Sequence, residues 1–336
     1  MSRERIPVVV VGAGHLGRIH AKIYAESDQA QLIAVCDLDQ ERAEQVAREF
    51  GVVAARDPME FADQARAFSV AVSTKAHAEV ATPLLERGLA CLVEKPLASN
   101  LADADRILAA SERSGAVLAV GHVERFQPSL RRVRELGIAP RFIECHRLTA
   151  FSFRSMDVGV VHDLMIHDLD LVLDLVGSEV TSFDAVGGKI LTEHEDMASV
   201  RLVFANGARA NITANRVSLS PMRRFRMFSP ESYVSLDFQK NYALIARKGP
   251  KWEEERPRLA ALGAEGKQEI GDVFKRGLFA IEEPELLGQR RPLQAQLDAF
   301  LRCVRTGEQP EVGGAEGRRA LELADRVVAA IAGQDW

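Results

Sequence analysis

Cysteine is scarce in this sequence, and its scarcity excludes two kinds of site. The 336 residues contain four cysteines, which are Cys36, Cys91, Cys145 and Cys303. They are widely spaced and form no CxxC pair, which argues against a disulfide framework and against a thiolate metal site. We therefore expect no metal centre, and a protein suited to the reducing environment of the cytoplasm.

Long apolar runs and an excess of positive charge are also missing. No segment approaches the ~18 apolar residues of a membrane helix, and the short apolar run near the N-terminus ends in glycines, as a strand would and a signal peptide would not. The formal net charge is −5, whereas nucleic-acid-binding domains usually present a strongly basic face. We therefore expect neither a membrane nor a nucleic acid as partner.

What the first third does contain is a regular alternation of apolar strands with amphipathic helices. Five of the six strands that we predict are 8–11, 31–37, 68–74, 90–96 and 116–122. Helices are predicted from Leu16 to about Glu26, from Gln40 after the N-cap Asp39, and over 101–114. Such alternation favours a parallel sheet covered on both faces. The predicted fold class is α/β, with an N-terminal Rossmann domain, a doubly wound parallel sheet, over residues 1–123.

The pattern changes after about residue 123. A helix is predicted over roughly 158–176, followed by alternating segments with short turns, among which Asn206-Gly207 is a strong hairpin signal. We expect residues 124–336 to form an α+β domain with an open, mostly antiparallel sheet. The charged segment 249–275 is predicted to be an exposed loop, and helices near 293–306 and 315–333 close the chain.

A glycine-rich loop, GAGHLG at residues 12–17, lies between the first strand and the first helix. Gly12 permits a tight turn, Gly14 lets the backbone approach a pyrophosphate, and Gly17 allows close packing of helix on strand. The start of the helix offers free N–H groups and a positive dipole end to a phosphate. With Asp37 at the end of the second strand, this order of elements predicts a dinucleotide site.

Asp37 also predicts which dinucleotide binds. Its carboxylate can accept both ribose hydroxyls and would repel a 2′-phosphate, and the next residue is Leu38 rather than an arginine. We therefore predict NAD as cofactor, because the Asp37 carboxylate disfavours NADP. NADP stays the alternative, because the cation of Arg42 is near enough to accept a 2′-phosphate. His15 and Leu16, between the last two glycines, are further predicted cofactor contacts.

Candidate catalytic groups come from two distant parts of the chain. Glu94-Lys95-Pro96 ends the fifth strand, at the carboxyl edge where ligands of open α/β sheets bind. Asp163 and His167 are four residues apart on a predicted helix and so share one face. A lysine, an aspartate and a histidine beside a nicotinamide suit the oxidation of an alcohol, because one group must take the hydroxyl proton while hydride leaves the carbon.

Several motifs resemble the glucose–fructose oxidoreductase / inositol dehydrogenase / MocA (Gfo/Idh/MocA) family over nearly the whole length. They are GAGHLGRIH (12–20), STKAHAEVATPLLERGLACLVEKP (73–96), VGHVERFQP (120–128), the run from Asp163 to Asp168, PLQAQLDAF (292–300), Pro310 and GGAEGRRALELA (313–324). The resemblance implies a Rossmann domain followed by a domain with an open-faced antiparallel sheet. It also implies an oxidoreductase that acts on CH–OH groups.

The same resemblance implies roles for individual residues. Lys95 and His167 form the acid/base pair, and Asp163 binds or orients the substrate hydroxyl or His167. The residues expected on the nicotinamide side of the cofactor are Thr74, His77, Glu94 and Lys95. One departure concerns the segment DVGVVHDLM (157–165), where many members have a run of three glycines and this chain keeps Gly159 alone.

His122 and Arg125 lie where the chain leaves the sixth strand, and two interpretations of them stay open. They either face the substrate, or they fix the crossing between the two domains. We carry both as predicted substrate-binding residues, together with Asp163 and His167.

The substrate is predicted by resemblance alone. The runs GHVERFQP, IHDLDLVLDLVGSEV and RLVFANGARANITANRVS look similar to family members that oxidise the 3-hydroxyl of UDP-linked N-acetylhexosamines such as UDP-GlcNAc. Inositol or a free monosaccharide is the alternative substrate. Three arginines are candidate diphosphate partners by charge alone, namely Arg154, Arg216 and Arg223.

Two other function classes and the assembly state complete the expectations. The doublets His162-Asp163 and His167-Asp168 could hold a divalent metal in a hydrolase, but that interpretation leaves the glycine loop and EKP unexplained. A non-catalytic NAD-binding regulator is disfavoured by the presence of the three candidate catalytic side chains. Because an antiparallel sheet with one open face needs cover, we expect a homodimer or homotetramer that associates through the C-terminal sheet.

Overall fold

The computed structural model describes residues 4–152, 158–286 without 262–277, and 288–334. It divides into two compact units, the first comprising residues up to 126 together with 290–326, and the second comprising 127–289 and the residues after 326. The boundary predicted between residues 123 and 124 lies close to residue 126, after which the chain first passes into the second unit. The return of residues 290–326 to the first unit differs from the predicted division.

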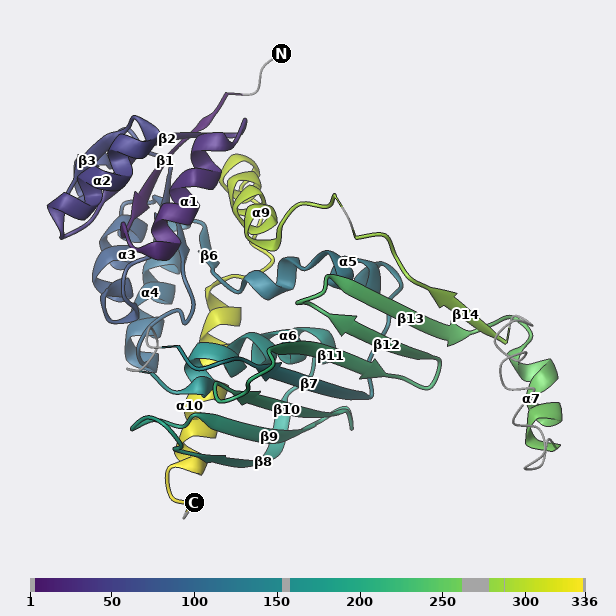
Figure 1. The fold of residues 1–336 in the computed structure, drawn as a ribbon. Helices are drawn as coiled ribbons and strands as arrows, with labels where there is room; N and C mark the ends of the chain where they lie inside the picture. Colours follow the sequence, from purple (N-terminus) through teal and green to yellow (C-terminus); the bar gives the residue numbers. More distant parts are fainter. Residues whose placement is uncertain (1–3, 153–157, 262–277, 287, 335–336) are drawn as a thin grey trace. The chain divides into compact units, whose positions relative to one another are not determined.

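The first unit contains a six-stranded parallel sheet in the order β3-β2-β1-β4-β5-β6 (Figure 1). Its strands are β1 (Ile6–Val11), β2 (Ala30–Cys36), β3 (Val53–Ala55), β4 (Ala67–Val70), β5 (Ala90–Val93) and β6 (Leu118–Val120). The strand order reverses between β1 and β4, which is the arrangement of a doubly wound nucleotide-binding sheet. The prediction of a parallel Rossmann sheet is therefore confirmed.

Helices cover both faces of this sheet. The longer ones are α1 (His15–Glu26), α2 (Gln40–Phe50), α3 (His77–Glu86), α4 (Leu101–Ser114) and α9 (Pro292–Thr306), and the single turns are η1 (Pro58–Phe61), η2 (Thr74–Ala76) and η3 (Val123–Phe126). One apolar core packs α3 and α4 against the sheet, and the other packs α1, α2 and α9 against it. Leu297 and Phe300 of α9 lie in that second core, which is why the returning segment belongs to the first unit.

The second unit contains an eight-stranded sheet in the order β14-β13-β12-β11-β7-β10-β9-β8. Its strands are β7 (Phe142–Leu148), β8 (Val180–Gly188), β9 (Met197–Phe204), β10 (Arg209–Asn215), β11 (Met222–Phe228), β12 (Ser232–Asp237), β13 (Tyr242–Lys248) and β14 (Phe279–Glu282). Only the pairing of β7 with β10 is parallel among those described. The predicted hairpin is present, with Gly207 at a φ of 81° between β9 and β10.

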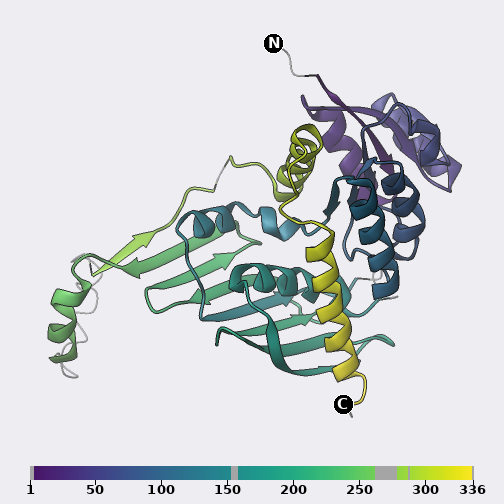
Figure 2. The same cartoon turned by 180° about the vertical axis from the view of Figure 1, so that it is seen from behind.

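Helices of the second unit lie on one face of this sheet and leave the other open (Figures 1 and 2). They are α5 (Pro128–Glu135), the π-helical turn η5 (Val161–Met165) and α6 (Ile166–Val176), while α7 (Trp252–Ala261) follows β13 and α10 (Gly314–Ile331) ends in this unit. The helix α7 corrects the predicted loop over its residues. Its Glu, Arg, Leu and Ala have high helix propensity, although Pro257 lies within it. Residues 262–277 lie outside the described ranges. None of the described helices is long and apolar enough to cross a membrane.

Candidate functional site

The glycine loop has the geometry that its sequence predicts. Gly12 has a φ of +101°, and a Cβ there would stand 2.5 Å from the carbonyl oxygen of Ala71. A Cβ on Gly17 would stand 1.7 Å from the carbonyl oxygen of Gly12, so α1 could not approach β1 with any side chain at that position. The turn and the close packing are therefore both confirmed as reasons for these glycines.

Gly14 differs from Gly12 and Gly17, because the packing of the protein itself does not require a glycine at this position. A Cβ at this position would meet no atom within 4 Å. Gly14 is the N-cap of α1, whose first turn holds no acidic residue and whose N-cap makes no side-chain hydrogen bond, so the helix itself supplies no anion at its positive end. His15 is exposed and Leu16 half-buried in that first turn. An open space at a helix N-terminus suits an anionic group such as a pyrophosphate.

Asp37 is held at the end of β2 by two backbone donors. Its Oδ2 accepts a hydrogen bond from the Ala13 N–H at 2.7 Å, and its Oδ1 accepts one from the Asp39 N–H at 2.9 Å. Each carboxylate oxygen keeps a further lone pair, which ribose hydroxyls could use. The guanidinium of Arg42 lies 3.2 Å from the carboxylate of Asp39 and forms an ion pair with it. Arg42 is therefore paired with Asp39.

Glu94 carries a buried polar network at the end of β5. Its Oε2 accepts the Lys95 N–H at 3.2 Å, and its Oε1 lies 3.3 Å from Nε2 of His20. The other ring nitrogen of His20 lies 2.8 Å from the hydroxyl of Ser69 in β4. A Cβ on Gly121 would lie 2.5 Å from the Glu94 carboxylate, so the glycine leaves room for it. These contacts fix the backbone that presents Lys95, whose own side chain is half-buried.

His77 fastens the same turn from the other side. Its Nδ1 lies 3.0 Å from the carbonyl oxygen of Pro96, and its Nε2 lies 3.2 Å from that of Val72. Burial lowers the pKa of His77, even though the neighbouring carbonyl oxygens favour the protonated ring. The ring is therefore neutral near pH 7, and only one of its two nitrogens donates a hydrogen bond to these carbonyl oxygens. A direct contact of His77 or Thr74 with the cofactor stays a prediction. The peptide bond between Lys95 and Pro96 is cis.

His122 and Arg125 are both buried where the chain leaves β6, and Arg125 lies within η3. Burial alone does not choose between a substrate contact and a role in the crossing between domains. Both interpretations therefore stay predictions.

Asp163 and His167 lie on the helical segment that follows Gly159 in the second unit. The helix opens with the π-helical turn η5, which contains Asp163, and His167 lies in the first turn of α6. Both side chains are half-buried. The predicted helix is confirmed, but its π-helical opening is not visible in a pattern of period 3.6, and such turns are frequent at functional sites.

A buried ion pair attaches this helix to the sheet next to His167. The guanidinium of Arg147 in β7 donates two hydrogen bonds to the carboxylate of Asp168, at 2.8 and 2.9 Å. Both side chains are less than 5% exposed. Fork-to-fork geometry fixes orientation as well as distance, so the backbone beside His167 is anchored on β7.

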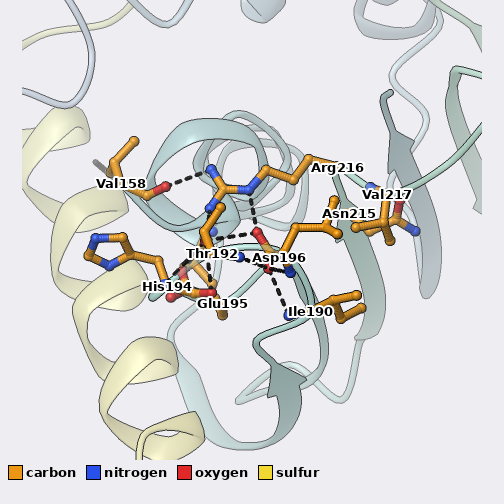
Figure 3. A network of polar contacts seen from close by, with 11 residues as sticks. Val158, Ile190, Thr192, His194, Glu195, Asp196, Asn215, Arg216 and Val217 are labelled. Atoms are coloured by element: carbon orange, nitrogen blue, oxygen red, sulfur yellow. Dashed lines mark hydrogen bonds and ion pairs between the residues drawn. The ribbon is translucent and has the colours of Figure 1, made fainter. Parts of the chain in front are cut away.

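A second buried pair joins Arg216 to Asp196, as Figure 3 shows. Arg216 is 3% exposed and bonded to protein groups, which contradicts its candidacy as a diphosphate partner. Arg223 is exposed at the start of β11, opposite Arg147 in the strand register, and remains a candidate. Arg154 lies outside the described residues.

The metal-hydrolase interpretation gains no support from the described part of the chain. No group of three or more His, Cys, Asp or Glu side chains in it is placed to hold a metal ion. Of the two His-Asp doublets that suggested a metal, the second has its carboxylate engaged by Arg147.

Comparison with protein-family models follows the division seen in the sequence. Residues 6–122 match the model described as the oxidoreductase family with an NAD-binding Rossmann fold. Residues 138–231 match the Gfo/Idh/MocA C-terminal domain.

The chain belongs to the Gfo/Idh/MocA oxidoreductase family. Among curated members, it is 35% identical to UDP-N-acetylglucosamine 3-dehydrogenase of Acidithiobacillus ferrooxidans, over 96% of each chain. It is 26% identical to myo-inositol 2-dehydrogenase of Thermotoga maritima, over 94% of this chain and 92% of that one. The solved structure of the Acidithiobacillus enzyme, named GnnA, superposes with a TM-score of 0.85 at 33% identity and covers 98% of each chain. This Gfo/Idh/MocA protein is therefore a sugar dehydrogenase of that family, with a nicotinamide-binding domain.

Sequence reasoning missed the residues that hold the candidate groups in place. Ser69, Arg147 and Asp196 each contact a motif or support one, yet none belongs to a motif that suggested chemistry. A signal existed for Arg147, because a charged residue at an inward position of an alternating strand requires a buried partner. No comparable signal marks Ser69. Gly121 belongs to the VGHVERFQP motif, but its role beside Glu94 depends on a contact that the motif does not show.

Proposed function

We propose that this protein is an NAD-dependent dehydrogenase that oxidises the 3-hydroxyl of a UDP-linked N-acetylhexosamine such as UDP-GlcNAc. The observation that carries the proposal is its 35% identity, over 96% of both chains, to a UDP-N-acetylglucosamine 3-dehydrogenase. The identity to the myo-inositol dehydrogenase from Thermotoga is lower, at 26%. That margin favours the nucleotide sugar over the alternative, an inositol or a free monosaccharide.

The proposed chemistry divides the work between the two units. When bound, the nicotinamide supplies the acceptor for the hydride from the sugar carbon. His167, with Lys95, removes the hydroxyl proton, and Asp163 orients the hydroxyl or the imidazole. Glu94 and His20 hold the backbone that presents Lys95, while the Arg147–Asp168 pair anchors the helix that presents His167.

The dinucleotide site is proposed from three features of the first unit. The open space at Gly14 and the N-terminus of α1 would receive the pyrophosphate. The carboxylate of Asp37, held by two backbone donors, would accept the ribose hydroxyls. The assignment of NAD rather than NADP rests on that carboxylate.

A substrate screen tests this function. Purified protein with NAD should form NADH, measured by absorbance, on addition of UDP-GlcNAc, and the sugar product should be a 3-keto derivative by mass spectrometry and NMR. We expect kcat/KM for UDP-GlcNAc to exceed that for myo-inositol or glucose by about 10²-fold or more, since loss of a paired polar group from a buried site costs at least that much. Faster turnover of an inositol would replace the proposed substrate. Tight NAD binding without turnover of any of these compounds would favour a non-catalytic regulator.

We also propose that the open face of the second unit's sheet binds a second copy of the chain. Side chains on this face include five large apolar or aromatic groups that are 36–49% exposed, namely Val186, Met222, Phe228, Tyr242 and Ile281. An apolar face of this kind is unusual on a monomer, and a mixture of charges across it, such as the Arg226–Glu144 pair, suits self-association.

Light scattering coupled to gel filtration tests the assembly. The protein should elute as a dimer or tetramer, and Val186→Glu, which places a charge within the open face, should shift it toward the monomer. The matched control is Leu219→Glu, because Leu219 is fully exposed in the loop between β10 and β11 rather than on the sheet. A monodisperse wild-type monomer would refute the proposed contact.

A further inference from the structure

The segment that leads into the π-helical turn is held from outside by one loop. The loop between β8 and β9, residues 189–196 (called here the 189–196 loop), places Glu195 against residues 158–161. The backbone carbonyl of Glu195 accepts the Val160 N–H at 3.0 Å, and its carboxylate Oε1 accepts the Val161 N–H at 3.2 Å. These are N–H groups at the start of a helix, where the helix itself provides no acceptor. Glu195 therefore acts as an external cap.

Gly159 is shaped to receive this cap. A Cβ at Gly159 would lie 1.9 to 2.2 Å from the three carboxylate atoms of Glu195, closer than any real contact allows. The carbonyl of Gly159 in turn accepts the Asp163 N–H at 3.0 Å. Gly159, the one glycine that this chain keeps from the family's glycine run, thus leaves space for the carboxylate of Glu195. Its carbonyl is also hydrogen-bonded to the backbone of Asp163, a candidate catalytic residue.

Arg216 ties the other end of the same segment to the 189–196 loop (Figure 3). Its Nη1 donates to the carbonyl of Val158 at 2.8 Å. Its Nε donates to Asp196 Oδ1 and its Nη2 to the hydroxyl of Thr192, both at 2.7 Å. One guanidinium therefore joins the segment before the helix, the tip of the loop and the end of β10.

Asp196 makes the loop a rigid support. Its Oδ2 accepts the backbone N–H groups of Ile190, Leu191 and Thr192, and its Oδ1 also accepts the Thr192 hydroxyl. Burial raises the pKa of the Asp196 carboxyl, but the backbone donors and Arg216 outweigh burial and leave that pKa well below its ordinary value. The carboxylate therefore stays ionised near neutral pH, and the support does not depend on pH there.

We propose that Glu195 and Arg216 are positioning residues for the reaction: they fix the π-helical turn and thereby aim Asp163 and His167. This inference rests on the proposed catalytic roles of Asp163 and His167. The two residues act through the backbone of 158–161, because Glu195 accepts the N–H groups of Val160 and Val161 and Arg216 donates to the carbonyl of Val158.

The kinetic test compares three single variants of the full chain. Glu195→Ala should lower kcat for UDP-GlcNAc by about 10- to 100-fold, because small misplacements of catalytic groups have effects of that size, with KM for NAD within about twofold. Glu195→Gln should recover most of the rate, since its amide oxygen can still accept the Val161 N–H. Glu193→Ala is the matched control, an exposed glutamate in the same loop, and should match wild type. The pH at which kcat rises should be the same in the wild type and the three variants, because the substitutions change the position of the catalytic groups and not their pKa.

Amide hydrogen exchange gives a readout that does not depend on turnover. Glu195→Ala and Arg216→Lys should speed exchange over residues 160–167, while Asp237→Asn should not. Asp237 is the matched control because it accepts the N–H groups of Gln239 and Lys240 in the turn after β12, a similar cap placed elsewhere in the same unit. Arg216→Lys also serves as the second kinetic variant if Glu195→Ala does not fold.

The outcomes separate the positioning role from the proposed function. The positioning role would be overturned if Glu195→Ala and Arg216→Lys kept the wild-type kcat, or if their loss of kcat only matched the fraction of unfolded protein. A low rate in His167→Ala would in that case still support the proposed function. A near-wild-type rate in His167→Ala would instead remove the catalytic assignment on which the inference rests.

Discussion

Replacement of Lys95 or of His167 by alanine is expected to lower kcat by about 10²–10⁴-fold, the usual size of a general acid–base contribution. Lys95 follows a buried glutamate whose contacts fix its backbone, and His167 precedes the aspartate that anchors α6 on β7. Because neither side chain belongs to the proposed pyrophosphate or ribose site, the Kd for NAD should change little. Steady-state kinetics and NAD titration by fluorescence measure both quantities on the same preparations.

Matched controls separate chemistry from general damage. Lys22→Ala removes an exposed lysine from α1, and His194→Ala removes an exposed histidine from the second unit. Both should retain turnover near that of the wild type. Near-wild-type turnover in Lys95→Ala and His167→Ala together would reject the acid–base assignment, whatever the dinucleotide site binds.

NAD is expected to give a kcat/KM on the order of 10²-fold higher than NADP, because a 2′-phosphate placed beside the Asp37 carboxylate costs several kcal/mol. The carboxylate cannot easily turn away, since Ala13 and Asp39 each donate a backbone hydrogen bond to it. Arg42 is the nearby cation that could have bound the 2′-phosphate, but it is paired with Asp39. Initial rates with each cofactor at saturating UDP-GlcNAc measure the ratio.

An Asp37→Ala variant should narrow this preference from both sides. It loses the acceptor for the ribose hydroxyls, so kcat/KM for NAD falls, and it loses the like charge, so kcat/KM for NADP rises. Glu41→Ala, which removes an exposed carboxylate from the first turn of α2, should leave the ratio unchanged. Equal efficiency of the wild type with NAD and NADP would show that Asp37 does not set the cofactor.

Local sequence signals predicted most of the first unit for physical reasons that the structure makes plain. Buried parallel strands produce continuous apolar runs, and Gly12 and Gly17 are needed for a positive φ and for a close approach of backbone. The strand β3 was not located because it has only three residues, of which Val53 is exposed. The return of α9 to the first unit could not be predicted either, because an amphipathic helix shows that it has an apolar face but not which core receives it.

Sequence motifs proposed candidate reactive groups but not the residues that support them. Lys95, Asp163 and His167 stand in short motifs, so spacing along the chain suggested them, and their catalytic roles stay predictions. Arg216 was misjudged, because charge alone does not tell an exposed arginine from one that is buried against a carboxylate from a distant loop. The role of Gly159 also depended on a contact with Glu195, 36 residues later in the chain, which no local pattern contains.

The central claim is that Lys95 and His167 act on the same hydroxyl of a bound nucleotide sugar, and a crystal structure with NADH and UDP-GlcNAc tests it most directly. The account predicts the Lys95 Nζ and a ring nitrogen of His167 within about 2.6–3.2 Å of the sugar 3-hydroxyl oxygen, or one water away from it. A complex in which either side chain turned away from that oxygen, or in which the sugar met the nicotinamide through another carbon, would contradict it.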